Sequence, residues 1–303
     1  MCYIIGMSTK PKPPTLKQFQ KRFPNDDVCL EHLMRIRYGK RFNCQSCHRA
    51  ANYYRVESRR CYECEHCGYQ VYPTAGTPFE QTRTPLTDWF FVMFLFSASR
   101  NGVAAKEVER QLGVTYKTAW RMCHHIRMHM GAVDGDRPLG GSRQSDPVVE
   151  IDEAFLGGRD RVGRDDKAVV LGIVERNGDV MSKQVGGRRG NQILPQVKKW
   201  VKEGSRVMTD DAPLYRGLDI HGFDHESVNH SEKEYVRGDA HTNTIESYWS
   251  LLKRGINGTY IHVSKKHLQK YLWEFEYRHN LRRSPHLMVD LLLLLVFQKP
   301  ALP

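Results

Sequence analysis

The sequence lacks an apolar run long enough to cross a membrane, and it lacks a segment that would direct export. The two longest apolar stretches, residues 89–98 and 287–297, are shorter than the about 20 residues that a spanning helix needs, and Asp290 interrupts the second. Residues 1–7 contain no long apolar region with a basic lead, so no secretory signal is expected. These absences argue against the membrane and secreted classes, and a cytoplasmic location is expected.

Acidic residues are in the minority. The 303 residues include 46 Lys/Arg and 34 Asp/Glu, which gives a formal net charge of +12. Residues 1–140 hold 21 basic and 12 acidic side chains, whereas residues 141–303 hold 25 and 22. A basic first half indicates a polyanionic partner. Because 40% of the residues are apolar, a largely disordered chain is excluded, and the length allows two or three domains.

The sequence contains no internal repeat, so the chain is expected to be a series of unlike segments. The predicted divisions are N-terminal helices (15–40), a cysteine-rich module (41–80), a helical segment (84–130), a linker (131–146), a β-rich domain with helices (147–285) and a C-terminal helix with a tail (286–303). Within the β-rich domain, alternation predicts strands at 148–156, 168–175, 180–185 and 206–209, and apolar periodicity predicts helices at 192–201, 242–254 and 265–278.

The eight cysteines are expected to be thiolates, since no export signal is present. Cys44-x2-Cys47 and Cys64-x2-Cys67 are two pairs with 16 residues between them, the spacing of a four-thiolate zinc site. Cys61 also forms a pair with Cys64, but the glycine after Cys67 favours Cys64 and Cys67 as the second pair. Four thiolates leave no open coordination position, so the predicted Zn²⁺ is structural. The alternative is a set of reduced structural cysteines.

Residues 104–130 have the pattern of two short helices. Gly113 ends the first helix, and Thr115 can cap the second. Two helices joined by a short turn with glycine are a helix-turn-helix candidate. Near the start of the second helix, where a recognition helix contacts DNA, the predicted DNA-binding residues are Thr115, Lys117, Thr118 and Arg121. The alternative is a plain helical hairpin within a bundle.

Two aspartates follow or interrupt predicted strands. Asp152 lies inside the apolar run 148–152, where alternation places Glu150 on the same face. A carboxylate inside a strand is costly unless it is paired or holds a metal. Asp210 directly follows the strand at 206–209, and the ends of such strands are where α/β sheets gather their ligands.

A third acid, Glu246, lies on the helix predicted from Thr242. At 3.6 residues per turn, the polar face of that helix is expected to carry Asn243, Glu246, Ser250 and Lys253. If Asp152, Asp210 and Glu246 converge, their carboxylates can hold two Mg²⁺ (or Mn²⁺) ions, and Lys253 can hold a phosphate. Each residue alone also fits a turn or a solvated helix face, but the set is more specific.

In these motifs the chain resembles the bacterial and archaeal insertion-sequence transposases of the ISXO-like kind, over roughly residues 23–286. The landmarks, in order, are the two cysteine pairs, Thr74-Ala75-Gly76-Thr77-Pro78-Phe79, Leu86-x2-Trp89, Leu112-Gly113-Val114, Thr118-Ala119-Trp120, Ile151-Asp152-Glu153, Thr209-Asp210, Val228-Asn229-His230-Ser231, His241-Thr242-Asn243-Thr244-Ile245-Glu246, Leu252-Lys253-Arg254-Gly255 and Glu274-Phe275-x2-Arg278-x-Asn280. The order of so many landmarks makes the resemblance specific.

The resemblance implies a zinc ribbon and a helix-turn-helix, followed by an α/β RNase H-like catalytic domain with C-terminal helices. It implies that Asp152 and Asp210 are the first two catalytic acids, that Asn243 is the third-place amide, and that Lys253 is the basic residue. Glu246 keeps the spacing of the wider DDE class and stays a second candidate for the third metal ligand, favoured because a carboxylate binds Mg²⁺ better than an amide does.

Three further residues, Asp211, His230 and His241, lie near these acids in sequence. Asp211 departs from the family, since glycine is expected after the second acid, and it adds a carboxylate that either competes for metal or faces solvent. His230 and His241 lie near the acids in sequence and are expected mainly in structural roles, with positioning of DNA or of a proton as the alternative.

The function that the resemblance implies is that of a DNA transposase, associated with the nucleoid. It would bind the terminal inverted repeats of its element, cleave the 3′ ends with Mg²⁺ and join them to target DNA. Two ends must meet in one complex, so at least a homodimer on DNA is expected. The alternatives are a domesticated, inactive DNA-binding protein and an RNase H-like nuclease without strand transfer.

Overall fold

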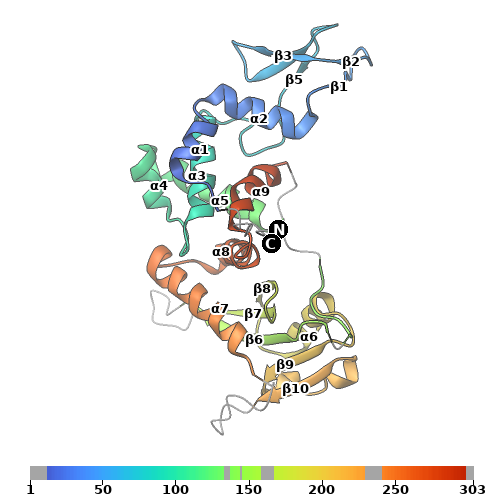
Figure 1. Cartoon of the computed structure of the whole chain (residues 1–303). Coiled ribbons are helices and arrows are strands. Elements are labelled where there is room, and N and C mark those ends of the chain that lie inside the picture. The colour runs from blue at the N-terminus through green and yellow to red at the C-terminus, as the bar shows by residue number, and fades with distance from the viewer. Residues whose placement is uncertain (1–11, 133–136, 144, 158–166, 229–240, 298–303) are drawn as a thin grey trace, which may run out of the picture. The chain divides into compact units, whose positions relative to one another are not determined.

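The computed structural model describes residues 12–132, 137–143, 145–157, 167–228 and 241–297 (Figure 1). These residues form two compact units. The first unit consists of residues 12–98 and 283–297, and the second unit of the described residues from 99 to 282. Within these ranges, every helix is too short or too polar to span a membrane.

The first unit combines helices with a small β-rich module. Its elements are α1 (Leu16–Arg22), α2 (Asp26–Tyr38), β1 (Phe42–Asn43), β2 (Ala50–Ala51), β3 (Tyr53–Val56), β4 (Cys61–Cys64), β5 (Gln70–Val71), α3 (Leu86–Ala98), the 3₁₀ turn η5 (Pro285–Leu287) and α9 (Met288–Leu295). Thr15 begins α1 with a capping box, in which its hydroxyl accepts from the N–H of Gln18 and the Gln18 side chain accepts in return. Helix α3 packs against α2 and α9, and Arg22 forms an ion pair with Asp290 at 2.5 Å.

The β-rich module consists of two small antiparallel sheets. Strands β1 and β2 form one sheet, and β3, β4 and β5 form the other in that order. The turn after β1 holds the first pair of cysteines, and the second pair consists of Cys64 at the end of β4 and Cys67 in the turn that follows. Two short hairpins with a cysteine pair each are the layout of a zinc ribbon, as the sequence predicts.

The second unit contains a pair of helices and a five-stranded sheet with its covering helices. Its elements are α4 (Ala105–Leu112), α5 (Tyr116–Met130), β6 (Val149–Leu156), β7 (Ala168–Glu175), β8 (Val180–Val185), α6 (Gly190–Trp200), β9 (Arg206–Asp210), η1 (Pro213–Tyr215), η2 (Asp219–His221), β10 (Asp224–Val228), α7 (Asn243–Arg254), the π-helical η4 (Gly255–Tyr260) and α8 (Lys265–Asn280). The sequence predicts the strands and helices of this unit closely, except β10.

The sheet has the order β10-β9-β6-β7-β8. Strands β6, β7 and β8 form an antiparallel meander, whereas β9 runs parallel to β6 and β10 runs parallel to β9. The sheet is therefore mixed, with β6 at its centre.

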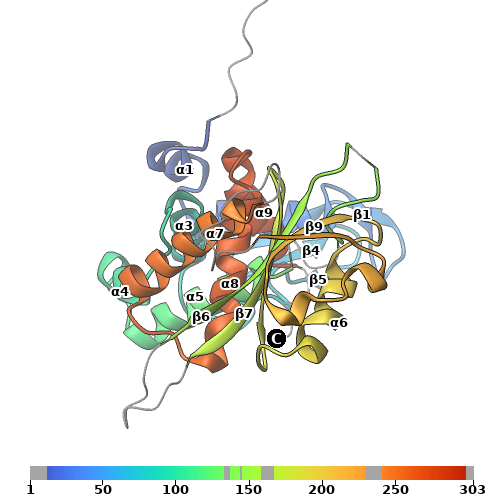
Figure 2. The same cartoon turned by 90° about the horizontal axis from the view of Figure 1, so that it is seen from below.

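Each face of this sheet is covered by helices, as Figure 2 shows for α6 on one side and for α7 and α8 on the other. Alternation along the strands divides the core in two. Ile151 and Ile173 pack with α6, whereas Ala154 and Val174 pack with α7 and α8. Since Glu150 and Asp152 share the side of Ala154, both point to the face that α7 covers.

The division into units differs from the predicted one at two places. The predicted helical segment 84–130 is split, because α3 belongs to the first unit and α4 and α5 belong to the second. The cause is that α3 buries seven apolar side chains, including Trp89, in the core of the first unit, whereas α5 packs on α8. The predicted C-terminal helix, 286–303, joins the first unit through α9 and α3, and residues 298–303 lie outside the described ranges.

A buried charge network joins α5 to α8. Arg127 Nε donates to Glu274 Oε2 at 2.7 Å, Arg127 Nη2 donates to the carbonyl of Val103 at 2.9 Å, and Arg278 Nη2 donates to Glu274 Oε1 at 2.6 Å. The Arg127 and Glu274 side chains are 3% and 0% exposed, so their charges are compensated within the protein. The α4–α5 pair is therefore part of the same unit as the sheet.

Candidate functional site

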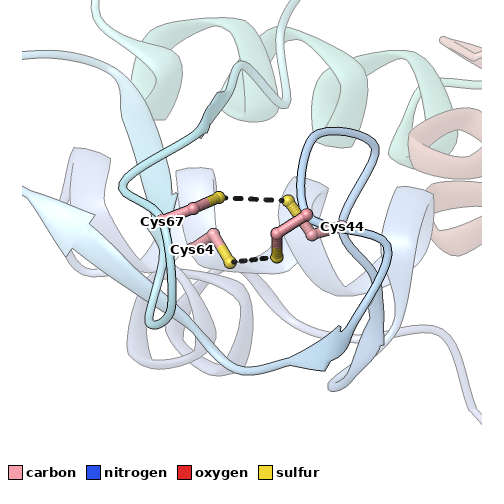
Figure 3. Close-up of side chains that lie close together, drawn as sticks. Cys44, Cys64 and Cys67 are labelled. Carbon is pink, nitrogen blue, oxygen red and sulfur yellow. Dashed lines mark hydrogen bonds between the residues drawn. The ribbon is translucent and has the colours of Figure 1, made fainter.

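The four cysteines of the predicted zinc site lie together in the first unit. Their sulfur atoms all lie within 4.8 Å of one another, with 3.6 Å between Sγ of Cys44 and Cys67 and 3.9 Å between Sγ of Cys47 and Cys64. Figure 3 shows the two facing turns and these contacts. Sulfurs bound to one zinc ion at about 2.3 Å in a tetrahedron lie about 3.8 Å apart, so the cluster fits a structural zinc ion.

Cys61 is outside this cluster. It pairs with Val56 across the β3–β4 ladder and is fully buried. Among the described residues, Cys44, Cys47, Cys64 and Cys67 are the one group of cysteine, histidine and acidic side chains close enough to share a metal ion.

Asp152 lies on β6 beneath helix α7. The indole Nε1 of Trp249 on α7 donates to Asp152 Oδ2 at 3.0 Å. Gly172 is the residue opposite Asp152 on β7, and a Cβ there would lie 2.5 Å from Cζ2 of Trp249. Gly172 therefore lets the indole pack against the strand and reach the aspartate.

Asp210 ends the parallel strand next to Asp152. Glu150 lies opposite Met208 in the β6–β9 register, and the two aspartates come two residues later on their strands. Burial, the largest cause, raises the pKa of Asp152 to about 6, and the negative charges of Glu153 and Asp210 act in the same direction. The two aspartates thus place two carboxylates at neighbouring strand positions, an arrangement that suits a divalent cation.

A second acid beside Asp152 points to the opposite face of the sheet. The buried carboxylate of Glu153 accepts from Arg188 Nε at 2.7 Å and from the hydroxyl of Tyr215. Arg188 Nη2 also lies 3.4 Å from Asp210 Oδ2. Arg188 therefore links Glu153 to Asp210. Sequence reasoning missed this link, although the adjacent acids Asp152 and Glu153 in an apolar strand are a signal for it.

Glu150 fixes the start of α7. Its carboxylate is fully buried and accepts from the backbone N–H groups of Thr244 at 2.8 Å and Ile245 at 3.0 Å. It also accepts from Arg176 Nε at 2.8 Å and lies 3.3 Å from His241 Nδ1. An anion at a helix N-terminus satisfies unpaired donors and complements the helix dipole. Glu150 and Trp249 therefore hold α7 on β6 around Asp152.

The polar face of α7 has the composition that the sequence predicts. Ile245, Tyr248, Trp249 and Leu252 are buried, whereas the predicted polar residues Asn243, Glu246, Ser250 and Lys253 are all exposed. The Glu246 carboxylate accepts from Thr242 Oγ1 at 3.4 Å. Within the described part of the chain, the carboxylates of Asp152, Asp210 and Glu246 do not form a second group close enough to share one ion. The structure brings the two aspartates together and leaves Asn243, Glu246 and Lys253 on the adjoining surface of the helix.

The predicted DNA-binding residues lie on the first turns of α5. Thr115 is the N-cap of α5, and its hydroxyl accepts from the N–H of Thr118 at 3.3 Å. Lys117 and Arg121 are exposed. Gly113 ends α4 in the left-handed conformation, with φ +66°, as the turn requires. The two threonines thus shape the helix start, while the two cations face solvent.

Of the two histidines near the acids, His241 contacts Glu150 and accepts from the N–H of Asn243 at 3.4 Å, which favours a structural role. His230 lies outside the described residues, as do 133–136 and 144 of the predicted linker.

The chain is similar to known proteins of transposable elements. Residues 141–280 match the ISXO2-like transposase domain, and residues 24–70 match the transposase zinc-ribbon domain. A protein in the transposable element ISH50 of Halobacterium salinarum is 29% identical over 289 residues, which cover 88% of this chain and 94% of that protein. A transposase-like protein of Haemophilus influenzae is 34% identical over 91 residues, 29% of this chain and 70% of that protein. The chain therefore belongs to the ISXO2-like transposases of insertion sequences.

Proposed function

We propose that this transposase binds the terminal inverted repeats of its element, cleaves their 3′ ends and joins them to target DNA in a divalent-metal-dependent reaction. The observation that carries the proposal is the juxtaposition of Asp152 and Asp210 on adjacent parallel strands, beside the polar face of α7. Two carboxylates on neighbouring strands, beneath a helix whose exposed face carries an amide, a further acid and an ammonium group, suit phosphodiester chemistry.

We assign the second unit to the RNase H-like class. The supporting observations are the mixed sheet in the order β8-β7-β6-β9-β10 and the meander that precedes two parallel strands. The first acid lies on the central strand, and the second lies at the end of its parallel neighbour.

The residues that would hold Mg²⁺ or Mn²⁺ are Asp152 and Asp210, with Glu246 or Asn243 as the third ligand. Oxygen donors suit these hard cations, and burial, with the nearby charges of Glu153 and Asp210 as smaller causes, raises the pKa of Asp152, so a bound cation would favour its ionised form. A bound ion would supply activation of a water or a 3′-hydroxyl and stabilisation of the leaving oxygen. Trp249 donates a hydrogen bond to the carboxylate of Asp152, and Lys253, exposed on α7, would contact a phosphate.

DNA recognition is assigned to the zinc ribbon and the α4–α5 pair as a helix-turn-helix. The exposed Lys117 and Arg121 lie where a recognition helix meets the major groove, and Thr115 and Thr118 lie on the same turn. Lysine and arginine contacts to phosphates release counterions, so binding is expected to weaken as salt rises. Since two ends react together, the active form is at least a homodimer on DNA.

A strand-transfer assay tests the proposal. Purified protein is incubated with the end DNA of its own element, target DNA and Mg²⁺, beside Asp152→Ala and the control Asp224→Ala, which changes an exposed aspartate on β10. Joined product with the wild type and the control, and none with Asp152→Ala, is the expected result. Cleavage without joining would indicate a nuclease, and end binding without cleavage would indicate a DNA-binding protein that has lost catalysis.

A further inference from the structure

A pocket of about 320 Å³ lies in the second unit where α4, α5 and α8 meet the segment after η4. Its walls include Tyr116 and Trp120 from the first turns of α5 and His267 and Tyr271 from α8. The volume is at the lower end of the range for pockets that take small ligands. The proposed metal site does not use any of these residues.

Several of the side chains that line the pocket carry flat rings. Trp120 stacks on His124 with ring centroids 4.6 Å apart and planes 21° apart, and His267 meets Trp120 edge-on at 5.4 Å. Tyr116 is 46% exposed and open to a further stacking partner. The buried Nδ1 of His267 has no hydrogen-bond partner within the described ranges. Such a surface can take a planar ring and offers it a polar contact.

Three cations lie at or near the pocket. Lys106 lines the pocket itself, where its Nζ lies 5.1 Å from the ring centroid of Tyr116 and pairs with Glu109 Oε2 at 2.7 Å. Lys117 and Arg121 are exposed on the same turns of α5. Burial lowers the pKa of His124 to about 4, so this imidazole is neutral near pH 7 and stacks as an uncharged ring. A ligand with a planar base and an anionic backbone matches both the walls and the rim.

Ile261 stands at the rim in a strained conformation. Its φ and ψ are +64° and −52°, and His262 N–H donates to the carbonyl of Tyr260 at 2.6 Å, which closes a γ-turn around it. Left-handed backbone is unfavourable for a β-branched residue, and such strain persists only where the surroundings impose it. The Ile261 side chain is 81% exposed, so the turn directs an apolar group to solvent.

The turn is anchored by the residue that precedes Ile261. The hydroxyl of Tyr260 accepts from the N–H of Val103 at 2.9 Å and donates to the buried Glu274 at 2.7 Å. Tyr260 also packs against Gly102, where a Cβ would lie 2.0 Å from its hydroxyl oxygen. The fold therefore holds the turn, and with it the exposed isoleucine, in a fixed place beside the pocket.

We propose that this pocket takes one unstacked nucleobase of the bound DNA, and that Ile261 is the wedge that enters the base stack where the base leaves it. The inference rests on the proposed DNA binding by α5. Apolar side chains inserted between base steps unstack a duplex, and aromatic side chains accept displaced bases without regard to sequence. The adjoining cations then hold the phosphates on either side.

A duplex with a single bulged 2-aminopurine, and the same duplex fully paired, test the inference with the full-length protein. The free energy needed to extrude a base from the stack is lowest when that base is already unpaired. The wild type is expected to bind the bulged duplex about tenfold more tightly, within the range that stacking one base on an aromatic side chain provides. Affinity is measured by anisotropy of a fluorophore at the far end, and base capture by the change in 2-aminopurine emission.

Two variants of exposed side chains, Tyr116→Ala and Ile261→Ala, are expected to lose the preference for the bulge and keep their affinity for the paired duplex. Ile220→Ala is the matched control, because Ile220 is 87% exposed and lies away from the pocket residues in η2. Circular dichroism confirms that each variant is folded.

Equal affinity of the wild type for the two duplexes would overturn the pocket proposal and leave DNA binding intact. Failure to bind either duplex would overturn the proposed DNA binding itself. A preference for the bulge that survives in both Tyr116→Ala and Ile261→Ala would place the base elsewhere on the protein and would also overturn the inference.

Discussion

The indole of Trp249 donates its N–H to Asp152 across the interface between α7 and the sheet, at 3.0 Å. This bond joins the helix that carries Asn243 and Glu246 to the strand that carries the first acid. It also favours the ionised carboxylate, against the burial that raises the pKa of Asp152. The position of the helix and the charge of the acid are thus coupled through one side chain.

Metal binding is expected to depend on pH through Asp152. The folded-state pKa of about 6 lies above the ordinary value of 3.8, so the carboxyl is largely protonated at pH 5 and largely ionised at pH 7.5. Because protons compete with the cation, affinity for Mn²⁺ should rise across this interval. The same raised pKa means that stability falls as pH rises from about 4 to about 6 and then levels off. Titration of Mn²⁺ by electron paramagnetic resonance at several pH values measures the first effect.

Trp249→Phe should shift the pH profile of Mn²⁺ binding to higher pH. The variant removes the hydrogen bond that favours ionised Asp152, so the pKa of Asp152 rises and metal binding begins at higher pH. Trp200→Phe is the control, because the indole nitrogen of Trp200 has no hydrogen-bond partner in the described residues. An unchanged profile in Trp249→Phe would mean that the indole does not act on the acid.

Glu150→Ala is expected to destabilise the second unit strongly. The change leaves Arg176 and the N-terminus of α7 without their buried anion, and loss of one partner of a buried ion pair costs about 3–5 kcal/mol. Glu226→Ala is the control, because Glu226 is partly exposed and lies 3.6 Å from Arg206 in an exposed ion pair. The expected loss in the free energy of unfolding for this variant is less than about 1 kcal/mol. Urea denaturation gives both values, and similar losses in the two variants would contradict the role of Glu150.

The cysteine cluster should hold one zinc ion per chain. Cys67→Ser is expected to lose the bound zinc ion. Cys61→Ala should keep one zinc ion per chain, because Cys61 is buried in β4 outside the cluster. Native mass spectrometry distinguishes the two. If Cys67→Ser kept its zinc and Cys61→Ala lost it, Cys61 would be the fourth ligand in place of Cys67.

Glu246→Ala and Asn243→Ala separate the two candidates for the third metal ligand. Mutation of a residue that only hydrogen-bonds to a metal ligand lowers metal affinity or activity by about 10–100-fold, and loss of a carboxylate ligand itself should lower them further. We expect Glu246→Ala to reduce Mg²⁺-dependent cleavage by more than that range and Asn243→Ala to reduce it less. Ser250→Ala, on the same exposed face, should be neutral. Full cleavage by Glu246→Ala would assign the position to Asn243.

The helices and central strands could be predicted because their periodicity is local. The burial of Ile245, Tyr248, Trp249 and Leu252 follows from spacing along a single helix. Strand β10 was missed for the opposite reason: it is an edge strand in which Val228 is the one buried residue, and Asp224 and Glu226 are polar, so no apolar pattern marks it.

The sequence placed Glu150 and Asp152 on one face but did not reveal what holds the site together. Glu150 meets Thr244 94 residues later, and Arg188 reaches Glu153 from a separate loop. Such contacts depend on tertiary folding, and no spacing along the chain encodes them. The split of the predicted segment 84–130 has the same origin, since the partner of α3 is α9, near the other end of the described chain.

The pairing of α3 with α9 has a consequence during synthesis. The helix of residues 86–98 leaves the ribosome roughly 190 residues before its partner at 288–295, an interval on the order of 10–40 s at ordinary rates of translation. The unit made first therefore completes its core last, after the whole of the second unit has emerged. A nascent chain that terminates early would keep its cysteine turns but would expose the apolar side of α3, which makes truncated products targets for proteases and chaperones.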